Sequence, residues 1–362
     1  MSACRRVQLW CCGCLLVLGC GLLQFAESVG AQEVRDQAAA RPAGGHAEAG
    51  FGPGWALAYS PDGKWLAVGG MDCELNIRAL DDRSLFRSLA GHESPCACAR
   101  FSKDGSELLS FGRHVIVWSA KDWTIAREVR PVEAGRFLAV AHELPLAATV
   151  PESRDRKAVI IWDHMTGEVV QELKIEGIPL CAAFDSTDFL LAVGLLAETK
   201  EKLLGVEIWD LKTQRRIQTI DRLSGSVSSL AFSTDGDRLA IGESWTARVW
   251  GVKTGRDVRR FEGHSGVIEA VSFSPDGTLL AAGGDGPIQR TRNGSKLLSE
   301  LKLWRIEDGR LLKSCAGDLG RTRNVQFSDD GLRVAWTDAT SVQVTSPNDF
   351  KLEWSALLGG GR

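Results

Sequence analysis

The sequence predicts an all-β fold made of seven repeats of four short antiparallel strands. Three observations support this prediction: a recurring Ser-x-Asp-Gly turn, a recurring apolar strand that usually ends in Trp, and a regular spacing between the copies. In the copy Ser274-Pro275-Asp276-Gly277, Pro presets φ at the second position of the turn and Gly relieves strain at the fourth. Each turn therefore joins the first strand of a repeat to the second.

Six copies of this turn are recognisable along the chain. They lie at Ser60–Gly63, Ser102–Gly105, Asp185–Asp188, Ser233–Gly236, Ser274–Gly277 and Ser328–Gly331. A seventh, degenerate copy fits between Phe137 and Ala148. Seven first-to-second strand turns indicate seven repeats.

The third strand of each repeat gives a second, independent register. Its copies are Asn76–Arg78, Ile116–Trp118, Ile160–Trp162, Glu207–Trp209, Arg248–Trp250, Lys302–Trp304 and Gln343–Thr345. Successive copies are separated by 40, 44, 47, 41, 54 and 41 residues. Repeats of roughly 40 to 45 residues with four strands each are typical of propeller blades. We therefore expect a seven-bladed β-propeller of four-stranded antiparallel blades.

Three short motifs carry a family resemblance. They are Gly-His at 91–92 and 263–264, Phe-Ser-Pro-Asp-Gly at 273–277, and Trp-Asp at 162–163 and 209–210. Over about residues 51 to 358 the chain resembles the WD40 repeat family through these motifs. The resemblance implies a rigid platform that binds proteins or peptides on the face carrying the Gly-His turns.

The resemblance also implies a buried hydrogen-bond network of His, Ser or Thr, Asp and Trp in each blade. Blade six offers His264, Asp285 and Trp304, with Ala282 where the hydroxyl is expected. Blade two offers His92, Ser110 and Trp118, with Arg113 and His114 in place of the Asp. Because no blade has the complete set, we expect the blades to depend more on apolar packing. The packing rings include Trp118, Trp162, Trp209, Trp250 and Trp304.

Composition agrees with a large globular domain. The chain has 362 residues, of which 44% are hydrophobic and 25% charged, with a net charge of −3. A slightly acidic protein gives no reason to expect a nucleic-acid partner. We expect a monomer that needs no cofactor.

The first 31 residues read as a signal peptide or signal anchor. Arg5 and Arg6 precede an apolar stretch at residues 7–25, and Val29-Gly30-Ala31 offers a cleavage site. An uncleaved anchor formed by residues 7–25 and a lipoprotein acylated at Cys20 are the alternatives. All three predict a location outside the cytoplasm, secreted or periplasmic, with membrane contact only through an uncleaved or lipidated N-terminus.

Residues 32–50 read as a flexible tether, because they hold small residues and few large apolar ones. The propeller is expected at 51–358 and a short tail at 359–362. Since the tether lacks strand character, we expect seven self-contained blades, with blade seven packed on blade one. The last blade would then supply its own fourth strand near Phe350–Leu357.

Five cysteines lie beyond the leader, at positions 73, 96, 98, 181 and 315. An odd number scattered through blades argues against a disulfide framework. The Cys96-Ala97-Cys98 pair lacks two further ligands for zinc. We expect packing roles and no metal site.

Extra chain length falls between second and third strands, on one face of the predicted ring. The longer connections are Pro151–Lys157, Glu198–Lys202 and Gly286–Lys296. Surface loops on a rigid scaffold are common binding sites, and solvated insertions without a role are the alternative. The candidate binding residues are Arg154, Arg156, Lys200, Arg290, Arg292 and Lys296. The basic loop of blade six would suit an acidic segment, a carboxylate or a phosphate.

No motif of a known catalytic class is present, so we expect a non-enzymatic interaction scaffold. The main alternative is a binder of small ligands or carbohydrates at the mouth of the tunnel, and a cryptic propeller hydrolase is the third. Trp245 and Trp336 could stack on a ligand there, although packing between blades is the favoured role for both rings.

Overall fold

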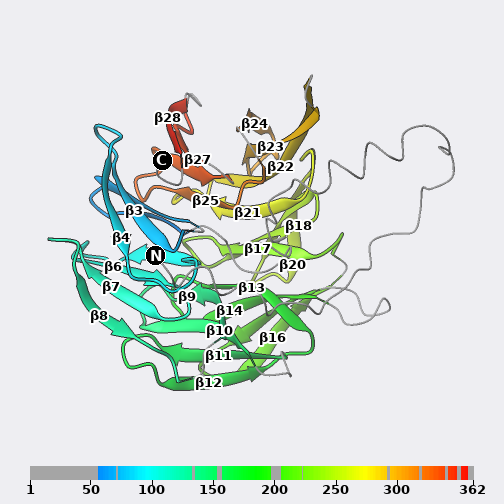
Figure 1. Ribbon diagram of the computed structural model, residues 1–362. Helices are drawn as coiled ribbons and strands as arrows, with labels where there is room; N and C mark the ends of the chain where they lie inside the picture. The colour runs from blue at the N-terminus through cyan, green and yellow to red at the C-terminus, as the bar shows by residue number, and fades with distance from the viewer. Residues whose placement is uncertain are drawn as a thin grey trace, which may run out of the picture. The chain divides into compact units, whose positions relative to one another are not determined.

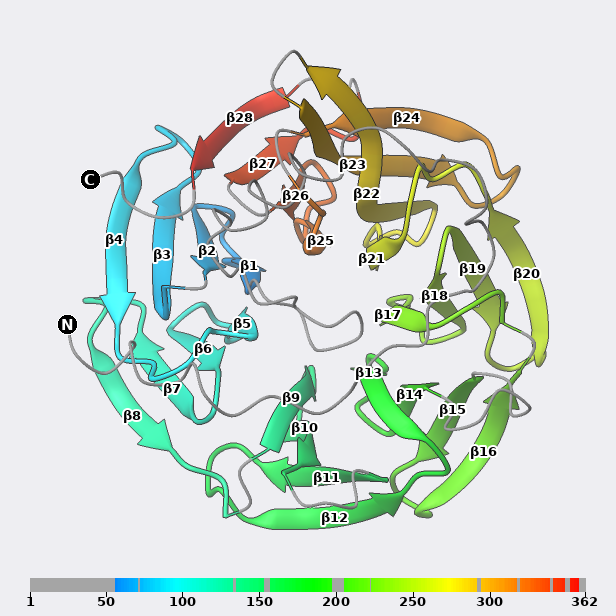
Figure 2. The same ribbon diagram turned by 45° about the vertical axis from the view of Figure 1, so that its right-hand side comes forward.

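The strands of the computed structural model form seven sheets, each made of four strands that are consecutive in sequence (Figures 1 and 2). The structure describes residues 56–70, 72–132, 135–152, 157–196, 205–221, 223–291, 294–317, 320–338, 341–348 and 352–357. Every paired neighbour within a sheet is antiparallel. The predicted all-β, seven-bladed propeller is confirmed.

The strands follow the order expected from the repeats. Blades one to four consist of β1 (Leu57–Tyr59), β2 (Trp65–Gly69), β3 (Glu74–Ala79), β4 (Leu85–Ala90); β5 (Cys98–Phe101), β6 (Glu107–Phe111), β7 (Val115–Ser119), β8 (Ile125–Val129); β9 (Gly135–Val140), β10 (Leu146–Pro151), β11 (Ala158–Asp163), β12 (Val169–Lys174); and β13 (Ile178–Phe184), β14 (Leu190–Leu196), β15 (Gly205–Asp210), β16 (Arg215–Ile220). Blades five to seven consist of β17 (Val227–Phe232), β18 (Arg238–Glu243), β19 (Thr246–Gly251), β20 (Arg256–Phe261); β21 (Ile268–Phe273), β22 (Leu279–Thr291), β23 (Gly294–Arg305), β24 (Leu311–Ala316); and β25 (Asn324–Phe327), β26 (Val334–Thr337), β27 (Ser341–Thr345), β28 (Leu352–Leu357).

The first strand of each blade lies nearest the ring axis and the fourth lies at the outer rim (Figure 2). Within the described residues, the sheet of blade seven is built from β25 to β28 alone, as expected from the tether's composition. One apolar cluster joins Tyr59 and Val68 of blade one to Ala335 and Val344 of blade seven. The ring is therefore closed at this junction by packing between two complete blades.

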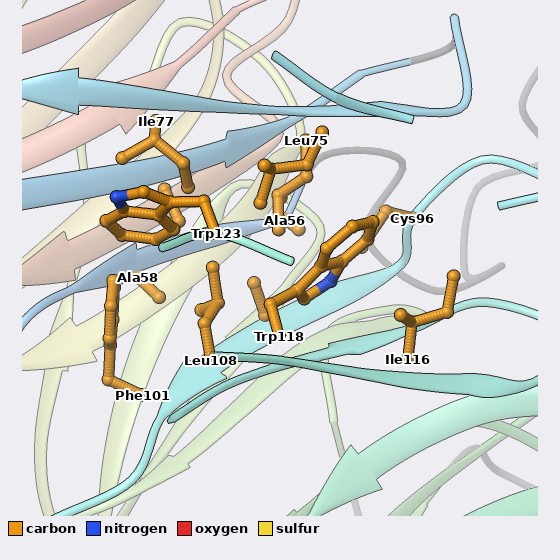
Figure 3. Packing of buried hydrophobic residues seen from close by; sticks show 13 residues of the cluster. Ala56, Ala58, Leu75, Ile77, Cys96, Phe101, Leu108, Ile116, Trp118 and Trp123 are labelled. Carbon is orange, nitrogen blue, oxygen red and sulfur yellow. The ribbon is translucent and has the colours of Figure 1, made fainter. Parts of the chain in front are cut away.

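Among the described residues, the hydrophobic core is divided into seven clusters, and each fills the space between two neighbouring blades. Figure 3 shows the cluster between blades one and two, where Leu75 and Ile77 of β3 face Trp118 and Trp123 of blade two. Alternate positions of each strand point to opposite faces of its sheet, so one blade contributes to two clusters. The blades thus stabilise one another rather than folding around a single centre.

The third-strand tryptophans pack into these inter-blade clusters. Trp118, Trp162 and Trp304 are buried, and Trp209 and Trp250 are partly buried. Trp336 is also buried, between blades six and seven, as the packing hypothesis requires. Truncating a buried ring of this size to Ala typically costs about 3 to 5 kcal/mol.

Five of the turns between first and second strands share one hydrogen-bond pattern. The Ser hydroxyl donates to the Asp carboxylate at 2.5 to 2.7 Å and accepts the N–H five residues after the Ser at 2.9 to 3.0 Å. The Gly that ends each motif has φ between 66° and 71°, a conformation that side chains disfavour. The serines are Ser60, Ser102, Ser233, Ser274 and Ser328.

The degenerate turn of blade three is held by its neighbour. Asp188, in the corresponding turn of blade four, is fully buried and occupies the position of the usual Gly, with φ of 60°. Its carboxylate accepts the N–H groups of His142 at 2.5 Å and Leu144 at 2.7 Å, and also that of Glu143. The missing local Ser-Asp bonds of blade three are thus replaced by a contact between blades.

The leader, the tether and the tail lie outside the described residues. Among the residues that the structure describes, no helix is both long and apolar enough to cross a bilayer.

Candidate protein-binding face

The two faces of the ring are built differently. We call the face with the turns between first and second and between third and fourth strands the turn face. The opposite face carries the connections between second and third strands and between successive blades, and we call it the loop face. His92, His264 and the long β22–β23 connection all belong to the loop face.

The basic insertion of blade six is a strand hairpin, so the expectation of a long loop at Gly286–Lys296 is wrong. β22 and β23 continue beyond the blade and stay paired from Ile288 with Leu297 to Thr291 with Gly294 (Figure 2). A strand ladder holds a surface more rigidly than an irregular loop. We call the part of β22 and β23 from Ile288 to Leu297 the blade-six hairpin.

A bulge marks where the hairpin leaves the blade. The pairing shifts between Asp285 and Ile288, so that Gly286 and Pro287 oppose a single residue of β23. A Cβ atom on Gly286 would lie 2.8 Å from the carbonyl oxygen of Ser299, so a side chain does not fit there. Pro is tolerated in a strand at such a bulge because its missing N–H is not needed by the ladder.

The hairpin presents apolar and cationic side chains together. Ile288 is 67% exposed, Arg290 is exposed and Lys296 is half-buried. The other predicted binding residues, Arg154, Arg156, Lys200 and Arg292, lie outside the described residues. The structure therefore locates two of the six predicted binding cations, and both are on this hairpin.

Trp245 is an exposed aromatic residue on the loop face of blade five. Its side chain is 65% exposed, so the packing role favoured for it is wrong. The carbonyl of Ser244 accepts the N–H of Ile268 at 2.6 Å, and the carbonyl of Val267 accepts the N–H of Asp285 at 2.9 Å. The turn that carries Trp245 is therefore bonded to Ile268, and the base of the blade-six hairpin is bonded to the preceding residue, Val267.

Below the hairpin, a carboxylate fixes the Gly-His turn of blade six. Glu300 lies 3.2 Å from His264 and 3.1 Å from Lys302, and accepts the N–H of Ser265 at 3.0 Å. Burial alone would raise the pKa of Glu300, but these partners lower it to about 2. Asp285, expected beside His264, instead pairs with Arg321 at 3.1 Å.

Blade two keeps most of the implied network. The Ser110 hydroxyl lies 2.7 Å from His92 Nε2 and accepts the Trp118 indole N–H at 2.8 Å. The ring centroid of His114, one of the two residues found in place of the implied Asp, lies 5.3 Å from that of His92. Burial lowers the pKa of His92 to about 4, so the ring is neutral at pH 7.

Blades four and five use other buried charges. Glu207 accepts the Trp209 indole N–H at 2.9 Å and an Arg216 N–H at 2.7 Å. Arg248 lies 3.1 Å from Glu243, and both side chains are almost completely buried. The available sequence signal was a charged residue two positions before a third-strand Trp, at Glu207, Arg248 and Lys302.

Charged groups near the tunnel are engaged with neighbouring blades. Arg100 of β5 donates to the carbonyls of Ala141 and His142, and Arg136 of β9 donates to that of Leu180 at 3.0 Å. Glu269 of β21 pairs with Arg321 at 3.0 Å. These three side chains therefore hold innermost strands to the neighbouring blades or connections.

The cysteines beyond the leader are all free thiols. Burial raises the pKa of Cys96, Cys98 and Cys181 to about 12, which keeps them protonated and unreactive. Within the described ranges, no group of three or more His, Cys, Asp or Glu side chains is arranged to hold a metal ion.

The family described as WD domain, G-beta repeat (WD40) matches residues 45–77, 215–251 and 255–286. These matches fall on repeats that the structure shows to be blades of one ring. The protein is a WD40-repeat propeller.

One curated relative of this WD40 propeller is the Periodic tryptophan protein 2 homolog of Dictyostelium discoideum. The two sequences are 24% identical over 190 residues, which is 51% of this chain and 20% of that protein. The chain therefore spans about a fifth of the length of this relative. WD40 propellers typically act as protein-interaction scaffolds.

Proposed function

We propose that this WD40 propeller is an exported, non-enzymatic scaffold that binds a protein or peptide partner through its loop face. The observation that carries the proposal is the exposed Trp245 on the turn next to a rigid hairpin that displays Ile288 and Arg290. Trp and Arg are enriched among the residues that dominate binding energies at protein interfaces. The proposed export rests on the leader-like residues 1–31.

The proposal is tested by affinity capture from an extracytoplasmic fraction. We expect the purified protein to retain a partner that is lost with Trp245→Ala and with Arg290→Glu combined with Lys296→Glu. Lys121→Glu combined with Arg310→Glu is the matched control, because it makes the same charge change on exposed residues of the turn face. A partner lost equally with the control pair would contradict binding through the loop face.

A second candidate function is small-ligand or carbohydrate binding at the tunnel mouth. It is favoured by the exposed ring of Trp245, since an aromatic face can stack on a sugar. Titration with candidate sugars would then change the Trp fluorescence of the protein, and Trp245→Ala would abolish the change. No change with any sugar, together with capture of a protein partner, would exclude this candidate in favour of the scaffold.

A further inference from the structure

The blade-six hairpin has two edges, and one of them is already engaged. The carbonyl of Leu297, on β23, accepts the N–H of Gly320 at 3.0 Å, outside the hairpin. In an antiparallel ladder, residues alternate between pairs that bond each other and pairs whose main-chain groups point outward. Leu297 and its partner Ile288 therefore form an outward-pointing pair.

The other edge of the hairpin is open. Because orientation alternates along a strand, Ile288 and Arg290 of β22 both direct their N–H and C=O groups away from β23. No described residue outside the hairpin forms a main-chain hydrogen bond with either of them. A row of unpaired main-chain groups on a held strand is a template for a further strand.

The open edge lies on the same side of β22 as β21, the strand with which β22 pairs inside the blade. The pairing of β21 with β22 begins at Phe273 and Leu280 and ends at Ile268 and Gly284. β21 is the innermost strand of its blade (Figure 2). An added strand would thus take up the pairing where β21 stops and lie toward the ring axis, over the loop face.

The charge of the blade-six hairpin indicates which kind of segment would pair with its open edge. From Pro287 to Leu298 the sequence contains Arg290, Arg292 and Lys296 and no acidic residue. The nearest acids are engaged, Asp285 with Arg321 and Glu300 with His264 and Lys302. A cation beside the open edge favours a segment with carboxylates, and the exposed Ile288 favours an apolar side chain nearby.

We propose that an extended acidic segment of a partner protein adds to the open edge of β22 as a further strand. Its main chain pairs with Ile288 and Arg290, its carboxylates meet Arg290, and an apolar side chain covers Ile288. A second copy of this chain suits the edge less well, because pairing of two such edges brings like charges together. The inference rests on the proposed scaffold function and names the class of its partner.

The test uses a randomised library of linear peptides selected on the purified protein. We expect the selected peptides to alternate acidic with apolar residues and to bind with a Kd measurable by fluorescence anisotropy. Methylating alternate backbone nitrogens of a selected peptide should weaken binding at least about tenfold, because two or more main-chain hydrogen bonds are lost. Peptides without acidic enrichment, or insensitive to N-methylation, would overturn the proposal.

Three substitutions separate charge from strand pairing. Arg290→Ala removes the cation and should weaken binding, while Arg290→Pro also removes the outward N–H and should weaken it further. Ser295→Pro is the matched control, since Ser295 pairs with Arg290 but lies on the opposite edge. Equal affinities for the Ala and Pro variants of Arg290, or an equal loss with Ser295→Pro, would show that the β22 edge is not the contact.

The inference and the scaffold function fail in different ways. A captured partner that needs Trp245 but tolerates Arg290→Pro would overturn strand addition and leave the scaffold standing. Selected peptides that need the β22 edge, with no protein captured, would support the edge as a site and count against the scaffold. A dimer of the chain that dissociates with Arg290→Pro, followed by sedimentation velocity, would identify a second copy as the occupant and overturn the acidic-segment proposal.

Discussion

The turn face repeats one hydrogen-bond pattern in five blades, whereas blades two, five and six each use a different polar pair on the loop face. On the turn face, Ser60, Ser102, Ser233, Ser274 and Ser328 make the same two hydrogen bonds. On the loop face, blade two uses His92 with Ser110, blade five uses Glu243 with Arg248, and blade six uses Glu300 with His264. The repeat is thus conserved within this chain on one side and diverged on the other.

The difference follows from the range of the bonds. A Ser-x-Asp-Gly turn is closed by atoms within five residues of one another, so each copy is specified by one short stretch of sequence. Two of the loop-face contacts join residues that are far apart in the sequence, His92 with Ser110 and Glu300 with Ser265, whereas Glu243 and Arg248 of blade five lie on adjacent strands. Such pairs can change as long as every buried polar group keeps a partner. Divergence is therefore possible where a contact joins two strands or two separate segments instead of closing one turn, and that is also where a binding surface can arise.

The largest effect is expected from breaking the buried ion pair of blade five. Glu243→Ala would leave Arg248, only 1% exposed, with Asp257 at 3.4 Å as its acidic neighbour and would remove the acceptor of the Ser224 N–H, and we expect a loss of about 3 kcal/mol in the free energy of unfolding. Urea denaturation measures it. Glu243→Gln is the control, because it keeps an acceptor for the Ser224 N–H and should cost less. Losses below about 1 kcal/mol for both variants would show that the pair is dispensable.

The next effect tests the irregular junction between the turns of blades three and four. Asp188→Gly restores the usual Gly and relieves the strain of φ 60°, but it removes the acceptor for three N–H groups of blade three. We expect a net loss of about 2 to 3 kcal/mol by thermal or urea denaturation. Asp188→Asn, which tolerates the same φ and keeps one acceptor, should lose less. If Asp188→Gly were as stable as the wild type, the three hydrogen bonds that Asp188 accepts would not stabilise the turn of blade three.

A third prediction concerns the pH dependence of the loop face. The pKa of Glu300 is lowered to about 2 in the folded protein, below the ordinary value of 4.5, so the folded state favours the carboxylate. Its contribution is therefore present above about pH 4.5 and is lost as pH falls toward 2. We expect Glu300→Gln to cost about 2 kcal/mol near pH 7 and progressively less in acid. A cost that stays constant in urea titrations from pH 7 toward 3 would contradict this account.

The smallest effect tests the uniformity of the turn face. Ser274→Ala removes the hydroxyl that bridges Asp276 and the N–H of Leu279, and we expect a loss of about 1 kcal/mol. Because the geometry is shared, Ser102→Ala, Ser233→Ala and Ser328→Ala should each lose a similar amount. Values that differ more than about twofold among the four turns would break the uniformity that the bonds indicate.

The sequence alone determined the propeller, its blade count and the register of its strands. The Ser-x-Asp-Gly turns and the third-strand Trp residues are local signals, and both recur at a regular spacing. It also indicated that blade seven is complete, because Phe350–Leu357 has strand character and residues 32–50 do not. These features depend on neighbouring residues in the chain, which is why periodicity reveals them.

Only the tertiary structure decided the details of the candidate binding face. The expected loop of blade six is a strand hairpin. Trp245 is exposed whereas Trp336 is buried, and His264 lies beside Glu300 instead of Asp285. The tertiary structure also assigned Asp188 of blade four to the defective turn of blade three. Each of these outcomes depends on which strands and blades become neighbours in space, and that is set by packing around the ring rather than by any short stretch of sequence.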